Sequence, residues 1–393
     1  MQQAWQGHIV GWAHTRFGRL DGMDVEALVR EVSAGALAHA GVGADEVDAI
    51  FVGHFNAGMV DDGFVSSMPL QAAPGWRFVP ATRVENACAS GSAAVYQALA
   101  AVQAGRARCA LVVGVEKMTA VSGAQVTSAL ANASYVHEEK AAGLTFPGIF
   151  AQIAGRYFER HGDHSRELAM IAAKNHRNGV HNPYAQLRKD LGFEFCNTVS
   201  EKNPIVAAPL RKTDCSLVSD GAAALVIVAA DALPRHARAV RFRAAVHVND
   251  RLPISARDPV LFEGPAEAWR RAYREAGCAV SDLGFAEVHD CFTIAELLSY
   301  EAMGLAPAGQ GGGLVREGVC EPAGRLPVNP SGGLKAKGHP VGATGVSMHV
   351  LAAMQLTGTA GDIQVPGATL GAVFNMGGAA VANYVSLLEA VKA

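Results

Sequence analysis

The sequence runs twice through one order of local patterns, and this repeat restricts the fold more than any other feature. An amphipathic helical segment, VEALVREVSAGALAHAG (25–41), precedes an acidic turn and an apolar segment in GADEVDAIFVGHF (43–55). The same order returns in PAEAWRRAYREAG (265–277) and CAVSDLGFAEVHDCF (278–292). The chain therefore predicts two related halves that pack on each other.

Two later features recur in the same order. A glycine-rich turn opens a helical segment and a strand follows, and each half then closes on a similar apolar segment. The first copies are NACASGSAAVYQALAAVQAGRARCALVVGVE (86–116) and SDGAAALVIVA (219–229), and the second are KGHPVGATGVSMHVLAAMQL (337–356), TLGAVFNMGG (369–378) and MGGAAVANYVSLL (376–388). Chance similarity between alanine-rich segments is the weaker explanation because three features keep their order.

The apolar runs predict an α/β fold. CALVVGV (109–115), AALVIVAA (223–230) and TLGAVFNM (369–376) are short, β-branched and uncharged, which suits strands buried on both faces. We expect a first half over residues 1–235 and a second over 240–393. Residues 118–212 have no counterpart in the second half and read as an irregular insertion, which in a compact fold is usually functional.

Composition argues against several classes of protein. The 33 basic and 36 acidic side chains give a net charge of −3, which provides no broad attraction to nucleic acid or to an anionic membrane. No uncharged apolar run reaches about 18 residues, and the start of the chain does not resemble a signal peptide. The seven cysteines are scattered without a CxxC pair. We therefore expect a cytoplasmic protein.

Three short stretches carry residues capable of chemistry. In VENACASG (84–91), Cys88 sits where a strand turns into a helix, so the helix N-terminus would lower its thiol pKa. A buried packing role remains the alternative for this cysteine. In GHPVGATG (338–345), His339 lies on a turn before a helix, from which it could reach Cys88 across the interface between the halves. A capping or core role for His339 is equally open.

The third stretch, HDCF (289–292), follows a buried strand. The carboxyl end of a strand is where sites form in α/β folds, so His289 and Cys291 are candidates. Cys291 has a buried packing role as its alternative, and Asp290 reads better as the N-cap of the helix that follows. No metal centre is expected, because four histidines of the insertion lack partners at ligand spacing and suit solvated loops: His161, His164, His176 and His181.

Together, ENACASG, SDGAAA, HDCF and NPSGGLKAKGHPVGATG resemble the motifs of the thiolase superfamily over nearly the whole chain. HDCF, the NPSGGLKAKGHP wording and GLTFPGIFAQIA (143–154) are similar to the sterol-carrier-protein-type (SCP2-like) thiolases. The resemblance implies two βαβαβαββ halves in a five-layered α-β-α-β-α sandwich, with an inserted loop domain that binds coenzyme A. It also implies acyl transfer between CoA thioesters, with no cofactor beyond these substrates.

The resemblance also assigns roles by position. Cys88 would be the acylated nucleophile and His339 the base that takes its proton. His289 and His339 would hold the thioester oxygen of the second substrate. The N–H groups of Cys88 and Gly377 would form the other oxyanion hole. Such enzymes are homodimers or homotetramers, and some work with an OB-fold partner protein.

One position departs from the general thiolase pattern. The second acid/base cysteine usually lies in a Cys-x-Gly-Gly-Gly turn, but this chain has Asn375 in NMGGA (375–379). Asn375 cannot exchange protons near neutral pH, so Cys291 is expected to act instead. Two enzyme rivals are retro-aldolases of steroid side-chain degradation, which need an OB-fold partner, and decarboxylating ketoacyl synthases. A non-catalytic CoA-binding scaffold is the rival from another class.

Overall fold

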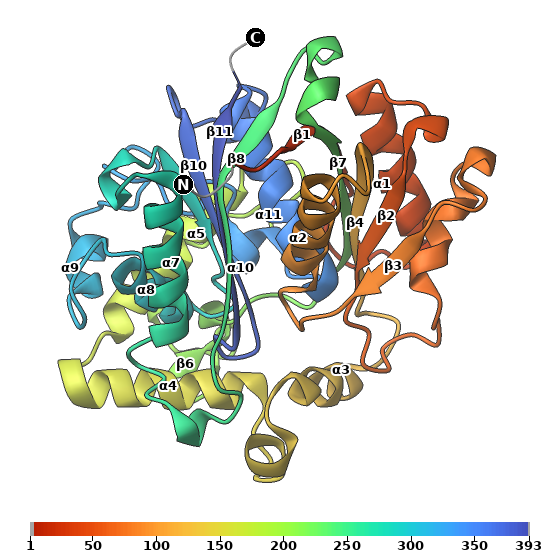
Figure 1. The fold of residues 1–393 in the computed structure, drawn as a ribbon. Coiled ribbons are helices and arrows are strands. Elements are labelled where there is room, and N and C mark those ends of the chain that lie inside the picture. The colour runs from red at the N-terminus through yellow and green to blue at the C-terminus, as the bar shows by residue number, and fades with distance from the viewer. Residues whose placement is uncertain (1–3, 392–393) are drawn as a thin grey trace.

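The computed structural model describes residues 4–391, which form two α/β halves of the same topology (Figure 1). The outermost ends of the expected ranges, residues 1–3 and 392–393, lie outside the described part. The first half holds the strands β1 (Gly7–His14), β2 (Ala49–Gly53), β3 (Ala81–Val84), β4 (Cys109–Lys117) and β7 (Asp220–Ala229). The second holds β8 (Val240–Asn249), β9 (Phe285–Val288), β10 (Leu370–Gly377) and β11 (Ala382–Ala390).

The strands join in one mixed sheet with the order β3-β2-β4-β7-β1-β8-β11-β10-β9. β2 runs parallel to both β3 and β4, and β9 runs parallel to β10. The strands nearer the junction of the two halves pair antiparallel. The halves meet where β1 pairs with β8, at His8 with Arg241 and Ile9 with Val240. The strands predicted from the apolar runs are therefore confirmed as β4, β7 and β10.

Helices complete five layers. α1 (Val25–Ala40) covers the outer face of the first half, and α7 (Glu263–Ala276) covers that of the second. α2 (Ser90–Gln103) and α11 (Val341–Leu356) lie between the strands of the two halves (Figure 1). The α-β-α-β-α sandwich expected from the resemblance is confirmed.

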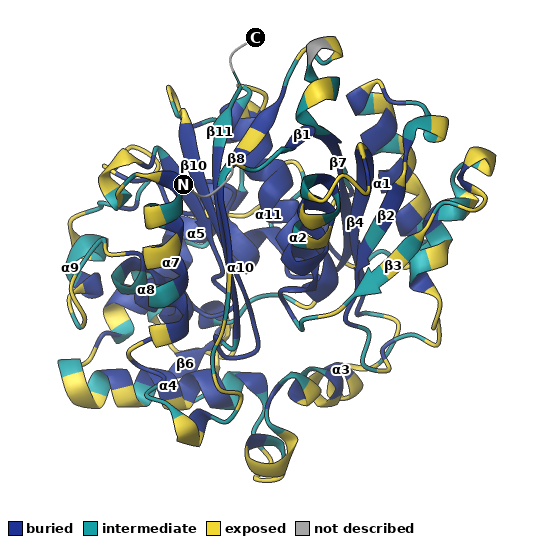
Figure 2. Cartoon of the chain, in the orientation of Figure 1, coloured by how far each residue is buried: buried dark blue, intermediate teal, exposed yellow. Residues whose placement is uncertain are grey.

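Glycines allow α2 and α11 to approach closely. A Cβ atom on Gly91 would lie 2.7 Å from the backbone nitrogen of Val346, and one on Gly345 would lie 2.2 Å from that of Ser92. Side chains cannot occupy such spaces without moving the backbone. Every residue of α11 is buried (Figure 2). This contact brings the N-terminal ends of both helices together at one place.

The two halves differ in local detail. Between β2 and β3 the first half has short 3-10 helices, Val65–Gln71 and Pro74–Trp76. The second half has α8 (Thr293–Ala302) and α9 (Gly311–Arg316) after β9. The counterpart of β3 is reduced to a single bridge between Ala286 and Val328.

The insertion between β4 and β7 is largely helical, so its expected irregular character was wrong. Its elements are α3 (Gly123–Leu130), α4 (Phe146–His161), α5 (Ser165–Gly179), α6 (Gly192–Asn197) and the hairpin β5 (Ile205–Ala207) with β6 (Leu210–Arg211). His164 and His176 are buried among them, which corrects their assignment to solvated loops. The amphipathic spacing of Ile149, Phe150, Ile153 and Tyr157 in α4 was a sequence signal for this helix.

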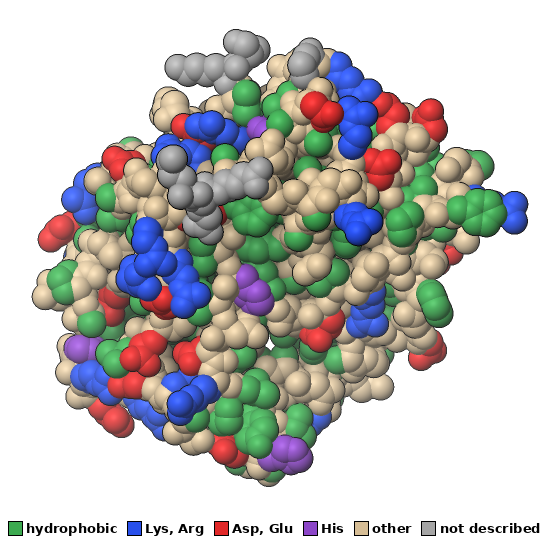
Figure 3. All heavy atoms as spheres, in the orientation of Figure 1, with side chains coloured by type: hydrophobic (Ala, Val, Ile, Leu, Met, Phe, Trp, Pro, Cys, Tyr) green, Lys and Arg blue, Asp and Glu red, His purple; other side chains and the backbone are tan. Residues whose placement is uncertain are grey.

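On the face shown in Figure 3, Lys and Arg side chains are interspersed with Asp and Glu side chains. In the described range 4–391, no helix combines the length and apolar character that crossing a membrane requires.

Candidate active site

A strained turn presents Cys88 at the N-terminus of α2. Ala87 has the left-handed value φ = 50°, which is unfavourable for a residue with a side chain. Ser90 compensates, because its Oγ accepts from the N–H of Asn86 at 2.9 Å and donates to the carbonyl of Ala87 at 2.6 Å. The turn therefore holds Cys88 in one fixed position between β3 and α2.

Burial keeps the Cys88 thiol protonated. It raises the thiol pKa to about 12, an effect larger than the opposing one of the Gly378 N–H that faces the sulfur. The charge of Glu116 raises it further. The expectation that the helix N-terminus lowers this pKa was therefore wrong for the free protein, because desolvation dominates. Chemistry at Cys88 requires a base that takes the proton.

His339 has a free ring nitrogen suited to that task. Its Nδ1 lies 2.7 Å from Oγ1 of Thr344, which itself donates to the carbonyl of Pro340 at 3.1 Å. Since the hydroxyl proton is used, Thr344 accepts from Nδ1–H, and Nε2 keeps its lone pair. Burial, reinforced by the charge of Lys337, lowers the His339 pKa to about 3, so the imidazole is neutral.

His289 has the opposite tautomer. Nδ2 of Asn375 lies 2.9 Å from its Nδ1 and 3.2 Å from the carbonyl oxygen of Cys88. A carbonyl only accepts, so the atom facing both groups is the amide donor, and Nδ1 of His289 accepts. The ring proton is then on Nε2. Burial holds the His289 pKa well below its usual range, and His339 and Lys337 lower it further.

The three side chains meet although they come from different halves. One ligand atom each of Cys88, His289 and His339 lies within 4.8 Å of the other two. The two imidazole rings are nearly perpendicular, with centroids 5.0 Å apart. Cys88 belongs to the first half. In the second half, His289 follows β9 and His339 precedes α11. The site therefore lies at the interface between the halves.

A cavity of about 800 Å³, including its open mouth, reaches this cluster. Cys88, Cys291, His339 and Gly378 form part of its wall, whereas His289 is buried next to His339 and is not part of that wall. Burial raises the Cys291 pKa well above its usual range, and the nearby Cys88 adds to this. The remaining wall is mostly apolar and includes Met118, Val126, Leu130, Phe146, Leu217, Val218, Phe292 and Val341.

The glycines of NMGGA pack against the Cys88 turn. A Cβ atom on Gly377 would lie 2.3 Å from the carbonyl oxygen of Asn86, so only glycine fits there. The adjacent Gly378 has φ = 63° and turns its N–H toward the sulfur of Cys88. The oxyanion-hole role of the Gly377 N–H stays a prediction, and Gly378 is a further donor that the motif alone did not single out.

Asp290 connects the two loops that carry the histidines. Its carboxylate accepts from the N–H of Leu334 at 2.7 Å and of Lys335 at 3.2 Å, in α10 (Gly333–Lys337). Its expected role as N-cap of α8 was wrong, since Phe292 occupies that position and no side chain caps the helix. Burial raises the Asp290 pKa to about 7, with a further contribution from Glu296.

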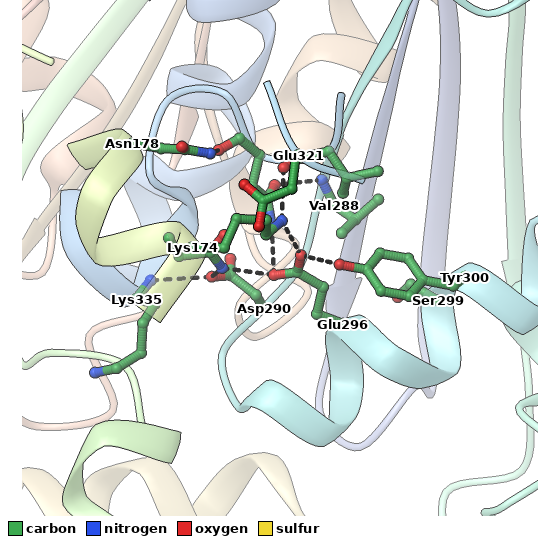
Figure 4. Close-up of polar contacts among 12 residues, drawn as sticks. Lys174, Asn178, Val288, Asp290, Glu296, Ser299, Tyr300, Glu321 and Lys335 are labelled. Carbon is green, nitrogen blue, oxygen red and sulfur yellow. Dashed lines mark hydrogen bonds and ion pairs between the residues drawn. The ribbon is translucent and has the colours of Figure 1, made fainter. Parts of the chain in front are cut away.

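A buried charge network supports this connection (Figure 4). Glu296 accepts from Nζ of Lys174 at 2.5 Å and from the hydroxyl of Tyr300 at 2.5 Å. Asn175 donates to Glu296 at 2.5 Å and to Asp290 at 2.8 Å. Lys174 and Asn175 belong to α5, so the insertion is tied directly to HDCF. The sequence signal that could have revealed this network is Lys174, a charged residue among the apolar residues of α5.

Family comparisons agree with this architecture. The family models described as "Thiolase, N-terminal domain" and "Thiolase C-terminal domain-like" match residues 8–231 and 246–390. The chain is 37% identical to an acetyl-CoA acetyltransferase of Methanothermobacter thermautotrophicus, over 94% of this chain and 96% of that protein. It is 33% identical to sterol carrier protein 2 of Oryctolagus cuniculus, over 95% of this chain and 70% of that protein.

Two solved structures share the fold. A chain of the Ltp2-ChsH2(DUF35) aldolase superposes with a TM-score of 0.84 at 21% identity, covering 98% of both chains. Human mitochondrial 3-ketoacyl-CoA thiolase in complex with CoA gives a TM-score of 0.75 at 17% identity over the full length of both. The family models match both halves, and one relative is similar along nearly its whole length. This chain belongs to the thiolase family.

Proposed function

We propose that this thiolase cleaves 3-oxoacyl-CoA with CoA, or runs the reverse Claisen condensation, through an acyl-enzyme on Cys88. The observation that carries the proposal is the meeting of Cys88, His289 and His339 beside one cavity. The similarity to an acetyl-CoA acetyltransferase over most of both chains supports acetyl-CoA as one of the thioesters handled. Acyl-CoA, 3-oxoacyl-CoA and CoA are the proposed substrates and products.

In the first half-reaction, Nε2 of His339 accepts the Cys88 proton while the sulfur attacks the 3-oxo carbon of the substrate. Both groups are neutral beforehand, and transfer from a thiol with a raised pKa to an imidazole with a lowered pKa becomes favourable only as the sulfur bonds to carbon. The N–H groups of Cys88 and Gly377 are proposed to stabilise the oxyanion. Cleavage of the carbon–carbon bond then leaves the acyl group on sulfur.

The other product leaves as an enolate of acetyl-CoA that needs a proton. Cys291 lines the same cavity, and its raised pKa keeps it a protonated donor. A weakly acidic thiol suits a weakly acidic carbon, since proton transfer is easiest between groups of similar pKa. Nε2–H of His289 and protonated His339 are the proposed donors to the enolate oxygen. CoA thiol finally attacks the acyl-enzyme and gives its proton to the Cys291 thiolate, while protonated His339 returns a proton to the departing Cys88 sulfur.

The test is mass spectrometry of the intact protein and its peptides after incubation with acetyl-CoA and, separately, acetoacetyl-CoA. One acetyl group on Cys88 is the expected result. Absence of an adduct from either thioester, with CoA binding retained, would contradict the proposal and favour a retro-aldolase or a non-catalytic CoA-binding scaffold.

Replacing Cys291 by alanine separates the two half-reactions. We expect the variant to keep self-acylation of Cys88 within a few-fold and to lose condensation by about 10²- to 10⁴-fold, because the acid/base group at the α-carbon is missing. Acetyl transfer followed by mass spectrometry and acetoacetyl-CoA formation followed by absorbance give the two rates. Normal condensation in this variant would remove Cys291 from the mechanism.

Asn375 is proposed as a positioning residue that fixes the tautomer of His289. Asn375→Asp keeps the size of the side chain but replaces the donor to Nδ1 by an acceptor, which draws the ring proton from Nε2 to Nδ1. We expect condensation to fall by about 10²- to 10³-fold, the usual loss for one oxyanion donor. Self-acylation should change far less. An equal fall in both rates would indicate a merely structural role.

Three further expectations remain proposals. Assembly as a homodimer or homotetramer rests on the thiolase resemblance alone, whereas a partner protein is supported by the thiolase-fold neighbour whose title joins Ltp2 to ChsH2(DUF35), and its OB fold is an expectation from the resemblance. Purification of the full chain followed by mass measurement in solution tests the first. The cytoplasm is the proposed compartment because all seven cysteines are free thiols.

A further inference from the structure

We propose that Cys88, His289 and His339 also form a reversible binding site for Zn²⁺, which inhibits the enzyme by occupying its nucleophile. The proposal rests on the geometry of the cluster and not on the reaction assigned to it. Cysteine sulfur and imidazole nitrogen are the ligands that Zn²⁺ prefers. All three side chains are buried, with ligand atoms within 4.8 Å of one another.

The required movements are small. Tetrahedral coordination with Zn–S and Zn–N bonds of about 2.3 and 2.1 Å places ligand atoms about 3.6 Å apart, so movements of about 1 Å close the cluster around an ion. Cys88 and His339 line the open cavity, which gives the ion a path from solvent. Water from the cavity can fill the fourth position, as in zinc sites with three protein ligands.

His339 already has the outer contact typical of a metal-bound histidine. Its Nδ1–H donates to Thr344, and its Nε2 lone pair is free. Metal-bound imidazoles commonly donate their second N–H to an oxygen, which fixes the ring. This ligand therefore needs no change of tautomer before it binds an ion.

His289 must change tautomer, and the structure contains the groups that allow it. Its Nε2 loses a proton and its Nδ1 gains one, so Asn375 must turn its amide oxygen toward Nδ1. This turn gives up the hydrogen bond to the Cys88 carbonyl and places two oxygens next to each other, which weakens the site. Oδ1 of Asn375 has no hydrogen-bond partner among residues 4–391. Oγ of Ser92, likewise unpartnered there, flanks the same space, since both atoms lie within 2.6 Å of the Cβ position of Gly345. The turned amide nitrogen can therefore donate to Ser92.

The proton balance follows from these steps. Cys88 binds the ion as a thiolate and releases its proton, whereas the His289 ring only exchanges one proton position for another. Binding of one Zn²⁺ therefore releases one proton to the solvent. Because the amide of Asn375 has to turn, the site binds more weakly than a preformed zinc site, which makes the inhibition reversible.

Titration calorimetry of the full chain with zinc chloride, in two buffers of different ionisation enthalpy, tests the site. We expect one ion and one released proton per chain. Cys88→Ala and His339→Ala should each weaken binding by at least about 100-fold, because loss of an outer contact to a ligand alone costs about 10- to 100-fold. Cys215→Ala is the matched control, because Cys215 lines the same cavity outside the cluster, and its affinity should stay unchanged.

Asn375→Asp gives a result that damage to the fold cannot imitate. A carboxylate accepts Nδ1–H without turning, so the affinity for Zn²⁺ should rise by about 10- to 100-fold. Absence of zinc binding, equal loss in Cys215→Ala, or unchanged binding in Cys88→Ala would overturn the proposal. If zinc binds as expected but acetyl-CoA leaves no adduct on Cys88, the metal site stands and the proposed function fails.

Discussion

Cys88→Ala is expected to abolish the acyl-enzyme and to lower kcat for thiolytic cleavage by about 10⁴- to 10⁶-fold, the range found when a covalent nucleophile is removed. The side chain is 9% exposed and loses only its sulfur, so the fold should be retained. Rates with acetoacetyl-CoA and CoA, together with the mass of the protein after incubation, measure both effects.

Cys215→Ala serves as the control for this experiment as well. Cys215 shares the cavity wall, and burial raises its pKa to about 12, as it does for Cys88. Cys215 has no histidine assigned as its base, whereas Cys88 lies beside His339. Removing the Cys215 thiol should therefore leave turnover nearly unchanged. A covalent adduct that persists in Cys88→Ala, or that disappears in Cys215→Ala, would show that the nucleophile is misassigned.

The repeat predicted the architecture because it encodes local structure and packing together. Helix and strand patterns predicted the two halves. Glycines in α2 and α11 allow these two helices to approach closely. Gly91 and Gly345 have no room for a Cβ atom, and this contact brings the turns of Cys88 and His339 together. Motifs far apart in sequence could therefore be expected to share one site.

Other properties depend on the folded environment and could not be predicted from the motifs. The Cys88 pKa depends on a balance between burial, which raises it, and the N–H groups of Gly378 and Cys88, which lower it, and a sequence does not reveal the extent of burial. The tautomers of the two histidines depend on single contacts, with Thr344 for His339 and with Asn375 for His289. The motif comparison treated Asn375 as a missing cysteine, whereas the structure gives it a donor function.

Asp290 illustrates a different reason for failure. A carboxylate just before a helical pattern is usually an N-cap of that helix, so the prediction was reasonable locally. In the fold, Asp290 caps α10, which lies more than 40 residues later in the chain, through its contacts with Leu334 and Lys335. Tertiary packing thus overrides a local preference, and it does so at the place where the segments that carry His289 and His339 meet.

Lys174→Met is expected to lower the free energy of unfolding by roughly 3–5 kcal/mol, because it leaves a buried carboxylate without its partner. Lys174 is 4% exposed, and its ammonium group also donates to the carbonyl of Val328 at 2.7 Å. The methionine retains most of the volume, so a cavity is not the cause of the loss. Guanidinium chloride denaturation, compared with the native chain at one protein concentration, gives the difference.

A control on the same helix separates burial from charge. Arg177 of α5 pairs with Glu321, but both side chains are more than one-third exposed, so Arg177→Met should cost no more than about 1 kcal/mol. The double variant Lys174→Met with Glu296→Gln should recover much of the lost stability, since the side chain at position 296 then carries no unpaired buried charge. A Lys174→Met variant no less stable than Arg177→Met would contradict this account. If the account holds, α5 stabilises HDCF through a paired charge, and damage to the insertion should reach His289 and Cys291 through that contact.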